Sequence, residues 1–270
     1  MTDRVHIARA VGAGFGAVAN TVSLTYFLLH ERQGLTSRLF ISLCFWDMTV
    51  CLTKLISELY RSGSEDVSTH HPLYIVAVYN TCFVTILIAV TRAISISRPF
   101  YHIRGKLVII AAAVFTMYSV TLKAVLMYKG EDKNSQALEW QISNLSEGVF
   151  FISLTFIIVL VSNIKCVLKL IRPGPQNVSK TKADAVKTVL ILSMVFCLTN
   201  CMMLLSVMRN LYGTLQGQGG SGRGLLSSLG NWLLLLNSTC NPIVYLIRKQ
   251  NMRDWLRRSL HRSQEEEVDL

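Results

Sequence analysis

Long apolar stretches separated by short basic segments constrain this sequence most, because a helix needs about 20 apolar residues to cross a bilayer. Seven stretches of the 270-residue chain reach that length. They are Ala8–Leu29, Leu39–Tyr60, Leu73–Ile96, Leu107–Tyr128, Val149–Ile171, Ala185–Met208 and Leu225–Ile247. The first is the least apolar, because it contains Gly12, Gly14 and Gly16, but small residues permit close helix packing. We therefore predict an all-α fold, a bundle of seven transmembrane helices.

The composition favours a membrane protein over a soluble one. Hydrophobic residues make up 51% of the chain and charged residues 16%, against about 25% charged residues in soluble domains. The net charge of +11 is compatible with nucleic-acid binding, but the basic residues lie between the apolar stretches and form no single stripe. The seven cysteines have neither zinc-site spacing nor a disulfide pattern. We expect no nucleic-acid partner and no cysteine-bound metal.

The distribution of lysine and arginine predicts how the chain is oriented. Cytoplasmic segments of membrane proteins carry an excess of these residues. With the N-terminus outside, the inner segments hold far more of them than the outer ones. We expect a multi-pass plasma-membrane protein with an extracellular N-terminus and a cytoplasmic C-terminus. The outer loop Lys129–Gly148 then contains a sequon at Asn144, which is a candidate glycosylation site.

The segment after the last span predicts a short amphipathic helix over residues 249–260. Its apolar residues recur at helical spacing, with arginine and lysine on the opposite face. These apolar residues are Met252, Trp255, Leu256 and Leu260. Such a helix lies on anionic lipid, and a disordered basic tail is the alternative. We expect a membrane domain over residues 1–262 and an acidic cytoplasmic tail over 263–270.

The last span contains a proline among polar residues. Pro242 removes one helical hydrogen bond, which costs about 3 kcal/mol in water. In a bilayer other groups must satisfy the freed carbonyl, and Asn237, Ser238 and Asn241 are nearby candidates. Polar clusters inside membranes usually mark function. We interpret this span as a kinked helix whose polar groups face the interior of the bundle.

Four motifs, in order along the chain, resemble those of rhodopsin-like G-protein-coupled receptors. The run Asn237–Tyr245 is similar to the seventh-helix motif of that family, and Leu43–Asp47 to its second-helix motif. Asn20 matches the first-helix asparagine, and Thr91–Phe100 resembles the end of the third helix with the following loop. The resemblance implies a receptor that binds an extracellular small molecule or short peptide and activates a heterotrimeric G protein by helix rearrangement.

The resemblance also implies an ion-binding or proton-binding switch at Asp47. A carboxylate near mid-membrane must be paired or protonated, and its counterpart in the family holds a sodium ion or a proton. Hard cations prefer oxygen ligands. The implied site consists of Asp47, Thr81, Asn237, Ser238 and Asn241. The alternative is a protonated Asp47 that only bridges helices. Asn20 and Pro242 are implied to serve helix packing.

At the inner face, the resemblance implies that Arg92 contacts the G protein. Tyr245 would turn inward to support it, while Pro99 and Phe100 would place an apolar side chain in the G protein. The alternative for Arg92 is an ordinary arginine at the membrane edge.

The chain departs from the family pattern around this arginine. Thr91 stands where the family has an acid, and Ala93 where it has an aromatic residue, so that Arg92 lacks a local carboxylate partner. Asp184 is a candidate substitute. The sixth span reads Phe196–Asn200 where the family has a tryptophan and a proline. These departures favour an alternative: a receptor-like protein without coupling, or a chemosensory-type receptor with divergent switch motifs.

The candidate ligand pocket consists of Lys54, Glu58, Tyr74 and Val78. Lys54 lies one heptad from Asp47, so the two residues share nearly the same helix face, and Glu58 can pair with Lys54 at i+4. The alternative is an intrahelical ion pair in which Lys54 reaches outward. Tyr74 aligns with the position where amine receptors carry an aspartate, which argues against a biogenic amine as ligand.

A transporter or membrane enzyme is a third hypothesis, which the sequence disfavours. No span carries paired catalytic carboxylates, a His-Glu-x-x-His helix or a Ser-Lys dyad, and no internal repeat supports a transporter. The last span has no lysine that could hold retinal. We expect no catalytic residue, and no cofactor beyond a sodium ion at Asp47.

Overall fold

The described part of the chain is helical throughout, as predicted. The computed structural model describes residues 2–31, 34–59, 72–97, 105–130, 135–171, 225–248 and 250–268, with short helical pieces between 191 and 212. Its helices are α1 (Thr2–His30), α2 (Leu35–Leu59), α4 (Pro72–Ser97), α5 (Gly105–Gly130), α6 (Ser135–Ile171), α8 (Leu225–Arg248) and α9 (Gln250–Val268). No strand occurs within these residues.

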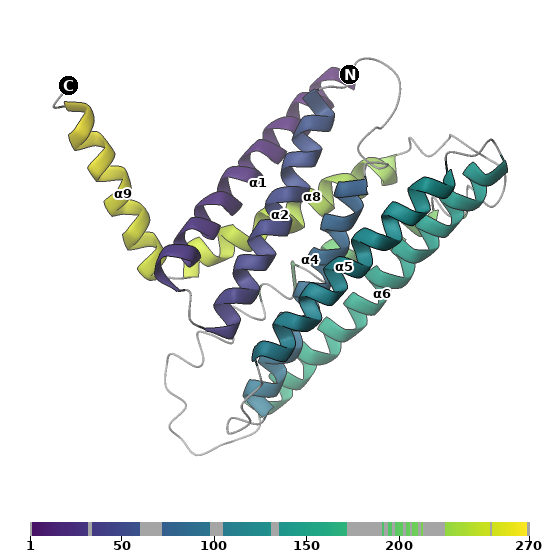
Figure 1. Cartoon of the computed structure of the whole chain (residues 1–270). Coiled ribbons are helices and arrows are strands. Elements are labelled where there is room, and N and C mark those ends of the chain that lie inside the picture. Colours follow the sequence, from purple (N-terminus) through teal and green to yellow (C-terminus); the bar gives the residue numbers. More distant parts are fainter. Residues whose placement is uncertain are drawn as a thin grey trace.

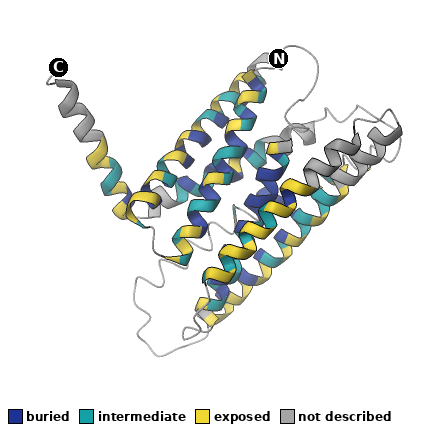
Figure 2. Cartoon of the chain, viewed as in Figure 1, coloured by how far each residue is buried: buried dark blue, intermediate teal, exposed yellow. Residues whose placement is uncertain are grey.

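Four helices in the described part are long and apolar enough to cross a membrane. These segments are His6–His30, Leu35–Leu59, Leu73–Ser95 and Ser146–Lys169. Many large apolar side chains on the helices are exposed, among them Met117, with 68% of its surface accessible. Figure 2 shows such exposed positions along the outer faces of α5 and α6. Apolar surface of this extent suits lipid better than water, so the chain has the character of a multi-pass membrane protein.

Two predicted boundaries were wrong. Residues 135–148 were predicted to lie in a loop but form the first turns of α6, which places Asn144 in a helix; its side chain lies outside the described ones. The tail over 263–268 continues α9. Hydropathy reports burial in lipid and not helicity, so polar stretches rich in good helix formers such as glutamate and glutamine extend helices beyond the bilayer. The predicted sixth span, 185–208, lies largely outside the described residues.

The helices pack side by side, with α4 in the middle. α2 packs between α1 and α4, and α4 also contacts α5 and α6, while α8 lies against α1 and α2 (Figure 1). Three apolar clusters among the described residues fill the contacts, and the smallest of them consists of Ala13, Ala17, Cys51 and Leu235. The Phe40 cluster consists of Tyr26, Phe27, Leu39, Phe40, Leu43, Cys44, Val84, Ile88 and Met252. The Val50 cluster consists of Val50, Tyr74, Ala77, Val78, Tyr79 and Ile152.

The apolar face predicted for α9 packs against α1. Met252 is fully buried in the Phe40 cluster. The Trp255 ring centroid lies 5.7 Å from that of Tyr26 and 5.8 Å from that of His30. Arginines on the other face of α9 are exposed. The amphipathic pattern read from the sequence therefore docks this helix at the end of the bundle where α1 ends (Figure 1).

Glycines let α1 approach α8 closely. A Cβ atom on Gly16 would lie 2.6 Å from Thr239 Oγ1 and 2.7 Å from Cys51 Sγ, and one on Gly12 would lie 3.2 Å from Leu235 Cδ2. A Cβ atom on Gly14, by contrast, would meet nothing within 4 Å. Small residues at Gly12 and Gly16 thus perform the close-packing role that the sequence predicted, and Gly14 does not.

Replacing Gly16 by alanine tests this contact. Gly16→Ala should lower the free energy of unfolding by about 1–3 kcal/mol, because the new methyl group forces α1 away from Thr239 and Cys51. Gly14→Ala is the matched control, with the same gain in helix propensity and no clash. Thermal unfolding of the purified protein in detergent measures both. Equal midpoints for the two variants would contradict the close approach.

Candidate functional site

Asp47, at the centre of α2, is fully buried and joined to two other helices. Thr81 Oγ1 of α4 donates a hydrogen bond to Asp47 Oδ1 at 3.2 Å, and Asn241 Nδ2 of α8 donates one to Oδ2 at 2.8 Å. The Ser238 hydroxyl of α8 is buried but makes no hydrogen bond with the described residues. Two of the four partners predicted for Asp47, Thr81 and Asn241, therefore bond to it.

Another predicted partner lies elsewhere. Asn237 Oδ1 accepts a hydrogen bond from Thr199 Oγ1 at 3.2 Å. Thr199 belongs to a short described piece of the predicted sixth span, and both side chains are buried. Within the described contacts, Asn237 thus connects α8 to that segment and does not bind Asp47.

The helical gap made by Pro242 is closed from another helix. Pro242 has no N–H, so the carbonyl of Ser238, four residues earlier, loses its helical donor. Asn20 Nδ2 of α1 donates to this carbonyl at 2.9 Å and to the Gly16 carbonyl at 2.9 Å. The packing role implied for Asn20 and Pro242 therefore has a physical basis. The sequence prediction that residues of α8 itself would satisfy the freed carbonyl was wrong.

Two side-chain oxygen atoms at the contact between α1 and α8 are buried without a hydrogen bond to the described residues. They are Asn20 Oδ1 and Ser238 Oγ. Oxygen atoms of this kind are the ligands that a sodium ion or a water molecule takes. Among the described residues, no group of three or more His, Cys, Asp or Glu side chains could hold a metal ion.

Arg92, near the end of α4, contacts an aromatic ring. Its guanidinium carbon lies 5.2 Å from the ring centroid of Phe40 in α2. The hydroxyl of the neighbouring Thr91 donates to the carbonyls of Leu87 and Ile88 in its own helix. The other residues expected around Arg92 (Pro99, Phe100 and Asp184) lie outside the described residues, as does the side chain of Tyr245.

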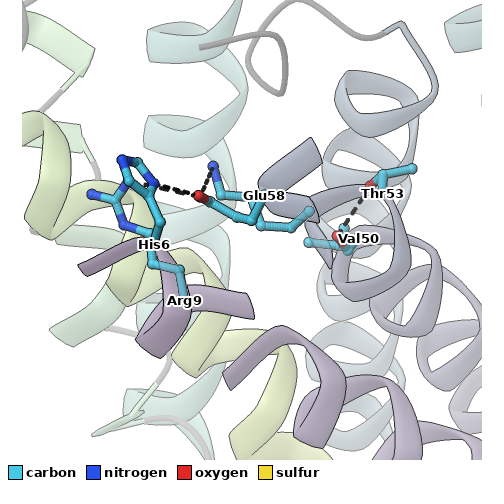
Figure 3. Close-up of polar contacts among 6 residues, drawn as sticks. His6, Arg9, Val50, Thr53 and Glu58 are labelled. Carbon is cyan, nitrogen blue, oxygen red and sulfur yellow. Dashed lines mark hydrogen bonds and ion pairs between the residues drawn. The ribbon is translucent and has the colours of Figure 1, made fainter. Parts of the chain in front are cut away.

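Basic side chains from α1 and α2 surround Glu58 at the end of the bundle where α1 begins. His6 Nδ1 lies 2.7 Å from Glu58 Oε2, while Arg9 Nη1 and Lys54 Nζ lie 3.7 Å and 3.5 Å from Oε1. Figure 3 shows His6 and Arg9 of α1 reaching toward Glu58 of α2. The predicted pair of Lys54 with Glu58 is confirmed. Lys54 is only 3% exposed, so this intrahelical ion pair lies inside the bundle.

Sequence reasoning missed His6 and Arg9. These residues are three positions apart and share one face of the first span, which is the available signal, but their partner lies on another helix. The two other pocket candidates, Tyr74 and Val78, are buried in the Val50 cluster. Val50 lies one helical turn from Lys54. The four predicted pocket residues thus divide between an ionic cluster and an adjoining apolar one.

A second buried polar network was also missed. Asn80 Nδ2 of α4 donates to Ser119 Oγ of α5 at 3.0 Å, and Thr116 Oγ1 donates to Asn80 Oδ1 at 2.7 Å. An asparagine within an apolar span was the signal for it. This network joins α4 to α5, because its side chains bond to one another across the two helices.

Three of these groups of contacts are spread along the bundle: the Glu58 cluster at one end, Asp47 in the middle, and Arg92 near the end of α4. No family model matches the chain, and no curated protein matches its sequence.

Replacing Glu58 by glutamine tests the ionic cluster. Glu58→Gln removes the carboxylate that lies beside Arg9 and Lys54, and removing one partner of a buried ion pair costs about 3 kcal/mol of folding stability. Lys54→Met is the control, because Glu58 then keeps two basic neighbours, and its cost should be clearly smaller. Thermal unfolding in detergent compares them. A Glu58→Gln protein as stable as the parent would contradict the contacts.

Proposed function

We propose that the chain is a rhodopsin-like G-protein-coupled receptor, which binds an extracellular small molecule or short peptide and activates a heterotrimeric G protein. The observation that carries this proposal is the buried Asp47, joined to α4 by Thr81 and to α8 by Asn241. Beside it, Asn20 of α1 bonds the carbonyl that Pro242 leaves free. The arrangement agrees with the roles that the sequence motifs imply.

A polar junction of this kind suits a conformational switch. A ligand shifts a two-state equilibrium only through differential contacts with the two states. If α8 moves relative to α2, the hydrogen bond from Asn241 to Asp47 must break or change, and no apolar contact in the bundle is as directional. Asp47 would then couple the end of the bundle that holds Glu58 to the end that holds Arg92.

The receptor proposal includes seven spans, with an extracellular N-terminus and a cytoplasmic C-terminus in the plasma membrane. Four described helices have the required length and apolarity. The excess of basic residues in the inner segments supports the orientation. α9 would then lie at the cytoplasmic face, where its exposed arginines meet anionic lipid. Glycosylation of Asn144 would take place on the outer side.

A sodium ion belongs to the proposal as a regulator of the switch. The Asp47 carboxylate would bind it, and the buried oxygen atoms of Ser238 and Asn20, which lack a hydrogen-bond partner among the described residues, are candidates for further ligands. A bound sodium ion would neutralise the carboxylate charge within the bundle. Thr81 and Asn241 stabilise the same carboxyl group by direct hydrogen bonds, so ion and protein donors would compete for it.

The ligand would bind at the end of the bundle where α1 begins. There Lys54 and Glu58 adjoin the cluster that contains Tyr74 and Val78. A ligand that opens this region would exchange contacts among His6, Arg9 and Glu58 for contacts with itself. In an assay of ligand-stimulated nucleotide exchange, Lys54→Met should weaken the response to the ligand. An unchanged response would show that Lys54 does not line the ligand pocket.

A receptor-like protein that does not couple is the second candidate, and one observation favours it. The Thr91 hydroxyl bonds within its own helix, and Arg92 rests on an aromatic ring. The acid that family members place beside this arginine is absent from position 91. A measurement of nucleotide exchange distinguishes the two candidates, because a non-coupling receptor would bind ligand without stimulating nucleotide exchange.

Nucleotide exchange by the purified protein tests the proposal. The full chain in lipid vesicles should accelerate exchange on a heterotrimeric G protein, alone or after addition of small metabolites and short peptides in turn. Asp47→Ala and Arg92→Ala should each reduce the acceleration by at least about fivefold, the lower end of usual coupling strengths. Ser95→Ala is the control, because this exposed residue of α4 bonds only its own helix. Exchange unaffected by either change would refute the proposed relay.

A further inference from the structure

Arg92 is a half-buried cation whose described contact is aromatic. The ion pairs in the described part of the chain all involve Glu58, which lies at the other end of the bundle. Arg92 instead places its guanidinium carbon 5.2 Å from the centroid of the Phe40 ring. A cation over an aromatic face is attracted by the negative charge of the ring surface, and more strongly where water is excluded.

The Phe40 ring is itself held in place. Phe40 is 5% exposed, and its ring stacks on that of Phe27 with centroids 5.6 Å apart. The surrounding Phe40 cluster includes Ile88 from α4 and the fully buried Met252 from α9. The aromatic face beneath Arg92 is therefore set by the packing of four helices and not by a freely rotating side chain.

A ring holds a cation differently from a carboxylate. The cation–π attraction is weaker than that of a buried ion pair, and it neutralises no charge. An arginine held in this way keeps its full positive charge and all its donors available. It can therefore leave α2 for an acidic or carbonyl acceptor more readily than an arginine in a buried salt bridge.

We propose that Phe40 is a positioning residue for Arg92: its ring retains the guanidinium against α2 in the resting protein and so limits spontaneous coupling. This inference rests on the proposed function, since it assigns Arg92 the contact with the G protein. Phe40 takes the place of the acid that position 91 lacks. Release of Arg92 then requires a movement of α4 away from α2, or a shift of the Phe40 cluster.

A thermal double-mutant cycle tests the contact without a G protein. Phe40→Leu, Arg92→Met and their combination are compared with Phe83→Leu, Arg92→Met and their combination, in detergent. The Phe40 pair should be non-additive by about 2 °C or more in unfolding midpoint. The Phe83 ring stacks on Phe115 and lies outside the Phe40 cluster, so the Phe83 pair should be additive. Additive midpoints for the Phe40 pair would overturn the inference.

Ligand-free nucleotide exchange tests the restraint. Phe40→Leu should raise the basal rate about threefold or more, since losing a contact of this strength shifts the equilibrium by such a factor. Phe40→Tyr, which keeps the ring face, should show the parental rate, and Phe83→Leu, which changes a ring outside the Phe40 cluster, should leave the rate unchanged. A parental rate in Phe40→Leu, from a parent protein that does couple, would overturn the restraint. If neither the parent protein nor any variant stimulates nucleotide exchange, with or without the small metabolites and short peptides, the proposed function fails. The thermal cycle alone then decides whether Phe40 holds Arg92.

Discussion

The burial of the Asp47 carboxyl group is the constraint on which the rest of the bundle depends. A carboxyl group removed from water needs hydrogen-bond donors in return, and an apolar span offers none of its own. Thr81 and Asn241 supply them from α4 and α8. The relative positions of α2, α4 and α8 are therefore linked through a single side chain, which apolar packing alone would not achieve because it is not directional.

A second constraint brings α1 into the same junction. Pro242 has no N–H and so frees the Ser238 carbonyl within α8, and Asn20 can reach that carbonyl only if α1 lies very close to α8. Gly16, one turn before Asn20, provides the room by lacking a side chain against Thr239 and Cys51. Gly16, Asn20 and Pro242 thus determine the contact between α1 and α8 together. This contact lies beside the Asp47 site along the same stretch of α8.

The sequence predicted contacts within a single helix, but it missed many of the contacts between two helices. Helical periodicity placed Lys54 against Glu58, and motif resemblance placed Thr81 and Asn241 near Asp47. The contacts of Glu58 with α1 and of Arg92 with Phe40 depend on how neighbouring helices are rotated about their axes, which hydropathy does not report. For the same reason the sequence could place Asn237 on the face of its helix toward the bundle interior, but it could not predict the hydrogen bond that Asn237 accepts from Thr199. The extension of α6 was missed because apolar length marks the bilayer and not the end of a helix.

The most direct test exchanges the two side chains at the central junction. Asp47→Asn replaces one of the two oxygen atoms that accept from Thr81 and Asn241 by an amide nitrogen. Asn241→Asp places two acids together. Each change alone should therefore lower the unfolding midpoint in detergent. Combining the two changes restores a donor facing a carboxylate. The double variant should be more stable than the sum of the single losses predicts, by at least about 1 kcal/mol. Additive losses would show that Asp47 and Asn241 do not bond, and would contradict the account of a switch built on their contact.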